Sequence, residues 1–165
     1  MKTLRLIWLA ALMTAVMLVP STAVSSTRVS AAGKQYLGDV APLNATISKW
    51  NAETSKWTES TTNAQIKAQT TPLIAAFRTF QQKLLHQLWP TKKAARDVEA
   101  LYTSVSFLES ILNALDTLTM PSAGAYLLEV QGQDSITASN ANPVRHDLGL
   151  AVLKTPSGRK LNYKF

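Results

Sequence analysis

The residues with the clearest chemical potential in this 165-residue chain are three neighbouring cations, Lys92, Lys93 and Arg96. They follow Thr91, a residue type that caps helices, and therefore fall in the first turns of a predicted helix. Free backbone N–H groups at a helix start attract anions, so nearby cations could help to hold a phosphate or a carboxylate. The alternative is an ordinary solvated face, on which Asp97 pairs with Lys93.

Tryptophans give a second candidate site. Trp57 and Trp89 fall at the ends of predicted helices, where partial exposure is expected. Together with Trp50 they could line a groove between helices, which is where bundles usually bind apolar compounds. Packing in the core is the alternative, and it explains Trp50 equally well.

The excess of positive charge lies at the end of the chain. Residues 33–134 contain nine basic and nine acidic residues, whereas residues 135–165 contain five basic residues and one acidic residue. Cations mixed with rings are typical of surfaces that attach to acidic polymers or lipid headgroups. The candidate attachment residues are Lys154, Arg159, Lys160, Tyr163 and Lys164. The alternative is an edge hairpin that its lysines keep soluble.

The sequence contains no motif for catalysis, metal binding or cofactor binding. It has no cysteine, which excludes thiol nucleophiles and disulfides. His86 is predicted on the polar face of its helix, and His146 lies beside Asp147, a position that does not form a facing pair. Paired-histidine, phosphate-loop and dinucleotide patterns are absent. We therefore assign no catalytic residue, no metal and no cofactor.

Asp134 allows two interpretations. It lies seven residues after Leu127 on an extrapolated apolar stripe, and a buried carboxylate there would have a perturbed pKa. Gly132, however, weakens a helix, and aspartate is a common N-cap. We favour the second interpretation, in which the helix breaks at Gly132 and Asp134 caps the next piece.

Residues 1–32 have the features of a secretory signal peptide. Lys2 and Arg5 precede an apolar run over residues 6–19, and Pro20 follows it. As a helix this run would cover roughly 21 Å, less than the ~30 Å of a bilayer core. The alternative is an uncleaved segment that anchors the protein in a membrane.

Small residues suitable for a signal peptidase occur in two places after that run. The first is Ser21 with Ala23, and the second is Val29 with Ala31 or Ser30 with Ala32. We favour the second cluster, which places the mature start near Gly33.

The elements that position these residues are helices. Apolar residues recur at steps of three and four in three segments, the period of a helix face. The stripes consist of Tyr36, Val40, Leu43, Ile47, Trp50 and Trp57; of Ile66, Leu73, Phe77, Phe80, Leu84 and Leu88; and of Val98, Leu101, Val105, Leu108, Leu112 and Leu115. The first predicts a helix over 39–57, and a fourth helical region is expected from Ala123 onward.

Prolines are expected to divide this pattern. Pro42 suits the first turn of the first helix. Pro72 lies inside the second stripe, so we interpret Thr71 as an N-cap with a break before it; a kinked continuous helix is the alternative. Asn142 and Pro143 similarly predict a restart, and Gly149 a left-handed stop.

The sequence thus predicts an all-α fold, a compact antiparallel bundle of about four helices over residues 33–149. Residues 150–165 form a basic C-terminal segment, either a small β-hairpin or a loose tail. A long coiled coil is less favoured because the prolines limit each helix to a few turns.

For function we expect an exported, noncatalytic bundle, of bacterial type, that binds a partner or ligand in the cell envelope or the medium. Candidate partners are an envelope protein, an acidic polymer or an apolar ligand, and no nucleic acid is expected outside the cell. Two alternatives stay open: an envelope component attached through its basic tail, and a hydrolase whose site the sequence does not reveal.

Overall fold

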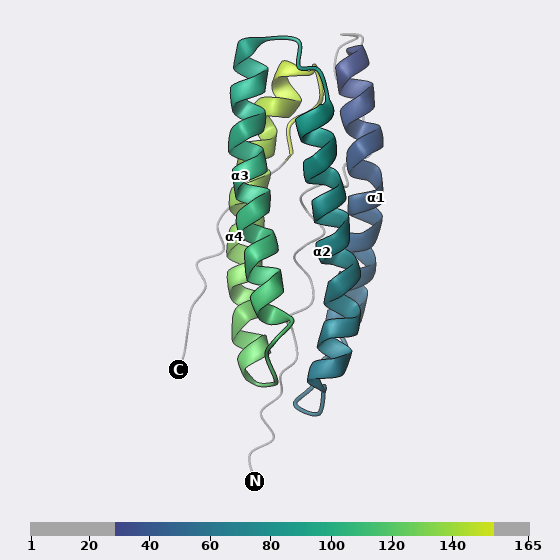
Figure 1. The fold of residues 1–165 in the computed structure, drawn as a ribbon, viewed down its shortest axis with the longest axis vertical. Coiled ribbons are helices and arrows are strands. Elements are labelled where there is room, and N and C mark those ends of the chain that lie inside the picture. Colours follow the sequence, from purple (N-terminus) through teal and green to yellow (C-terminus); the bar gives the residue numbers. More distant parts are fainter. Residues whose placement is uncertain (1–28, 154–165) are drawn as a thin grey trace.

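The computed structural model describes residues 29–153, which form four α-helices and no strand. The helices are α1 (Ala31–Thr54), α2 (Asn63–His86), α3 (Lys92–Leu115) and α4 (Ser122–Asp147). Short loops join them, so successive helices run antiparallel along one long axis (Figure 1). The prediction of an all-α, four-helix antiparallel bundle is confirmed.

The predicted stripes form the core. All six positions of the third stripe are buried in α3, and five positions from Tyr36 to Trp50 are buried in α1. Leu88 was predicted in the second stripe, and this was wrong because its side chain is 90% exposed. The reason is that α2 ends at His86 and the backbone of Gln87 is extended, which turns Leu88 off the helix face.

The predicted breaks at Pro72 and Pro143 were wrong, and so was the placement of Pro42 in the first turn of its helix. Pro42, Pro72 and Pro143 all lie inside continuous helices, and α1 begins eight residues before the expected Asp39. All three prolines occupy exposed positions, as do the residues four positions before them. Water can therefore satisfy the carbonyl groups that lose an N–H partner, while the opposite face of each helix stays packed in the core.

The N-caps of α2 and α3 were predicted with different success. Thr71 is not an N-cap, since its Oγ1 donates to the Lys67 carbonyl 2.8 Å away within α2. The N-cap of that helix is Thr62 instead, and Thr62 and Gln65 form a capping box. The predicted Thr91 cap of α3 is confirmed, with the Ala94 N–H donating to Thr91 Oγ1 at 3.0 Å.

The chain turns back on itself after α4. Gly149 has a φ of +73°, which confirms the predicted left-handed stop. Leu150 and Leu153 then return to the core, and Leu153 exchanges two hydrogen bonds with the Asn142 side chain. Residues 151–153 form no strand, and the rest of the predicted hairpin lies outside the described residues.

None of α1 to α4 is long and apolar enough to cross a membrane. The expected signal segment lies almost wholly outside residues 29–153, so this finding does not bear on it.

Candidate functional site

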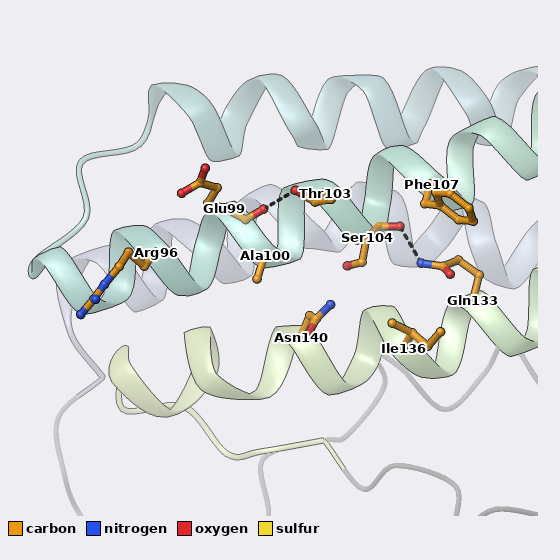
Figure 2. A pocket seen from close by; sticks show the side chains of 9 residues that line it. All are labelled: Arg96, Glu99, Ala100, Thr103, Ser104, Phe107, Gln133, Ile136 and Asn140. Carbon is orange, nitrogen blue, oxygen red and sulfur yellow. Dashed lines mark hydrogen bonds between the residues drawn. The ribbon is translucent and has the colours of Figure 1, made fainter.

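An open groove of about 560 Å³ runs along the outer face of α3 and α4. One stripe of α3 and one stripe of α4 form its two sides (Figure 2). The lining residues are Arg96, Glu99, Ala100, Thr103, Ser104, Phe107, Gln133, Ile136 and Asn140. Of these residues, only Arg96 was a candidate site residue from the sequence.

Side chains of unequal size line the groove. Ala100 fills little space on the α3 side, opposite Asn140 on α4 (Figure 2). Two large apolar side chains border the groove, Phe107, which is 63% exposed, and Ile136, which is 53% exposed. The sides of the groove are therefore mainly apolar.

The polar groups at the floor are already engaged. Gln133 donates from Nε2 to the Ser104 carbonyl at 3.1 Å, and the Ser104 hydroxyl donates to the Leu101 carbonyl at 2.9 Å. The Gln133 bond joins α4 to α3 and the Ser104 hydroxyl bond stays within α3, and together they leave little polar capacity for a ligand at the floor. A ligand in this groove would therefore be held mainly by apolar contacts.

The predicted basic cluster divides into two parts. Lys93 Nζ lies 2.7 Å from Asp97 Oδ2 and 2.9 Å from Asp147 Oδ2. Hydrogen bonds to Asp97 and then to Asp147 raise the pKa of Lys93, and the bond from Lys93 lowers the pKa of the Asp147 carboxyl. Lys93 is thus neutralised by two carboxylates, whereas Arg96 borders the groove and Lys92 is exposed.

The structure does not bring Trp57 and Trp89 together. They lie beyond opposite ends of α2, a 24-residue helix that is roughly 36 Å long. Trp57 is half-buried, packs edge-on against Trp50 at 6.2 Å and donates to Gln69. The indole of Trp89 donates to the Leu84 carbonyl at 3.1 Å. The two rings cannot line one groove, and each closes one end of the core.

Asp134 is buried in the middle of α4, with 6% of its surface exposed. The favoured sequence interpretation of Asp134 as an N-cap was wrong, because α4 continues unbroken through Gly132. Burial raises the pKa of the Asp134 carboxyl to about 7. The signal was present in the sequence as the seven-residue spacing from Leu127. Asp134 does not line the groove, although its neighbour Gln133 does.

The histidines do not form a site with other residues of the described chain. His86 is exposed, as predicted. His146 is also exposed, and its Nδ1 lies 3.5 Å from Asp147 Oδ1. Within residues 29–153 no three His, Asp or Glu side chains gather closely enough to hold a metal ion.

The candidate attachment residues Lys154, Arg159, Lys160, Tyr163 and Lys164 lie outside the described residues. Comparisons with protein-family models, curated proteins and solved structures gave no match. The function must therefore be argued from the geometry of this chain.

Proposed function

We propose that this protein is an exported, noncatalytic helical bundle that binds an elongated apolar ligand with an acidic group at one end. The observation that carries the proposal is the groove between α3 and α4, where Phe107 on α3 and Ile136 on α4 are both exposed. Exposed apolar area costs about 25 cal/mol per Å² relative to burial. A ligand that covers both side chains would recover that free energy.

The positive charge at one end of the groove supports an acidic group on the ligand. Arg96 stands at one end and makes no ion pair with residues 29–153, and Lys92 lies one turn before it on α3. Glu99 points away from α4 (Figure 2). From Arg96 to Phe107 is eleven residues, or about 16 Å of helix, which fits a medium-length acyl chain.

The proposed location follows from the sequence. Two basic residues, a 14-residue apolar run and Pro20 at the N-terminus are the features of an export signal. The absence of cysteine is compatible with folding in either a reducing or an oxidising compartment. We place the protein in the cell envelope or the medium, where an amphiphilic ligand would need a carrier or receptor.

The first experiment is native mass spectrometry of the protein purified from its own host, which would reveal a copurified ligand. The second is a titration with dodecanoate below its micelle-forming concentration, followed by changes in amide NMR signals along α3 and α4. Dodecyltrimethylammonium, with the same chain and a cationic head, is the matched probe. We expect dodecanoate to bind more tightly, because its carboxylate pairs with Arg96.

Three variants assign the binding to the groove. Phe107→Ser should weaken dodecanoate binding about tenfold or more, since an apolar contact of this size is worth on the order of 1–3 kcal/mol. Arg96→Gln should remove the preference for dodecanoate over the cationic probe. Leu85→Ser changes a residue of similar exposure on α2 and should have no effect. Equal losses for Phe107→Ser and Leu85→Ser would contradict the proposed site.

A further inference from the structure

The folded domain begins earlier than the sequence indicated. Ser30 is the N-cap of α1, and its Oγ accepts a hydrogen bond from the Gly33 N–H at 2.9 Å. The Lys34 N–H donates to the Ser30 carbonyl, also at 2.9 Å. Val29 and Ala32 pack against the core. Residues 29–32, which the sequence assigned to the signal peptide, are therefore part of the bundle.

These residues also join α1 to two other helices. The Ser30 hydroxyl donates to the Leu148 carbonyl at 3.1 Å, just after α4. Gln87, just after α2, donates from Nε2 to the Ala32 carbonyl at 2.9 Å. The approach is close, because a Cβ added at Gly33 would lie 2.8 Å from the Leu148 oxygen. One end of the bundle thus depends on the segment that includes Ser30 and Ala32.

Cleavage after Ala32 would remove the Ser30 cap and the hydrogen bonds that Ser30 and Ala32 make to the ends of α4 and α2. The new N-terminus would be an ammonium group on Gly33, which is buried against Leu148. That positive charge would lie at the positive end of the α1 dipole, where cations are destabilising. Cleavage after Ala31 would likewise remove the Ser30 cap and its bond to Leu148.

We infer that the signal peptidase of the host cleaves between Ala23 and Val24, an inference that rests on the proposed export. Water hydrolyses this peptide bond, which leaves a carboxylate on Ala23 and an ammonium group on Val24. Ser21 and Ala23 supply the small residues that such a peptidase requires before the bond.

The test is intact-mass measurement and N-terminal sequencing of the protein exported by its own host. The expected product begins at Val24 and retains Ser30. A product that begins at Ala32 or Gly33 would overturn the inference and leave export intact, and so would an exported product that keeps Met1. Protein found only inside the cell would instead contradict the proposed export.

The structural basis has its own test in purified chains. A chain of residues 33–165 should melt at least about 5 °C below a chain of residues 24–165, because it lacks the Ser30 cap and the bonds to Leu148 and Gln87. Ser30→Ala in the longer chain should reproduce part of this loss. Ser139→Ala, at an exposed position of α4, is the control and should leave Tm unchanged. Equal Tm values for the two lengths would overturn the inference.

Discussion

Lys93 Nζ lies 2.9 Å from Asp147 Oδ2, so the second residue of α3 is joined to the last residue of α4. The same ammonium group also contacts Asp97 one turn along α3. The sequence predicted the Asp97 contact from its spacing of four residues. The Asp147 contact depends on the antiparallel packing of two helices and could not be read from the sequence.

This ion pair should contribute stability over a defined pH range. The pKa of Lys93 is raised above 10.5, so its contribution is present below pH 10.5 and is lost as the pH rises through the folded-state pKa. The pKa of Asp147 is lowered below 3.8, so its contribution is present above pH 3.8 and is lost as the pH falls through the folded-state pKa.

We expect Lys93→Gln to lower Tm slightly at pH 7 and low salt, and the difference should shrink in 1 M NaCl because the Lys93 ammonium group is exposed to solvent. Lys92→Gln, at the neighbouring exposed position, should have a smaller effect. A loss that is the same at both salt concentrations would mean that Lys93 acts through packing and not through charge.

Asp134 should make the bundle less stable as the pH rises. Its pKa is about 7 in the folded chain against 3.8 unfolded, so folding favours the neutral carboxyl group. Stability is therefore greatest below pH 3.8 as far as this group is concerned, and it falls between pH 3.8 and about 7. Above that range the deprotonated group costs on the order of 4 kcal/mol.

We expect Asp134→Asn to stabilise the protein at pH 8 by up to a few kcal/mol, with a difference that diminishes toward pH 4. Urea unfolding at the two pH values measures it. Glu129→Gln, at an exposed position of the same helix, is the control and should change stability little at either pH. The same gain at both pH values would show that the charge of Asp134 is not the cause.

Two glycines of α1 should respond oppositely to alanine. At Gly33 a Cβ would meet the Leu148 backbone oxygen at 2.8 Å, so Gly33→Ala should destabilise by about 1–3 kcal/mol. At Gly38 there is nothing within 4 Å, so Gly38→Ala should stabilise by about 0.5–1 kcal/mol. Thermal unfolding of both variants measures this, and a stabilised Gly33→Ala protein would contradict the close approach of α1 to Leu148.

Pro72→Ala should stabilise α2. Proline in a helix interior costs about 3 kcal/mol relative to alanine, and the exposed position leaves room for the ordinary backbone N–H. The gain should be smaller than that, on the order of 1–2 kcal/mol, because proline also restricts the unfolded chain. Urea unfolding measures it, and a destabilised variant would indicate that Pro72 fits its local backbone better than alanine does.

The sequence by itself determined the fold class. Periodic apolar positions such as Val98, Leu101 and Val105 identify the buried face of a helix because the period of 3.6 residues belongs to the helix alone. The Thr91 cap and the Gly149 stop were also predicted, since both act through hydrogen bonds or backbone geometry within a few residues.

The tertiary structure alone decided that α2 and α4 run unbroken through the predicted breaks, and it alone decided the candidate site. Pro72 and Gly132 are local signals for a break, yet packing along the buried faces keeps α2 and α4 continuous. The groove between Phe107 and Ile136 joins residues that are far apart in the sequence, on helices whose register the sequence does not state. Packing also decides the burial of Asp134. The free energy of packing is summed over many contacts along a helix, and it outweighs a local signal that acts over only one turn.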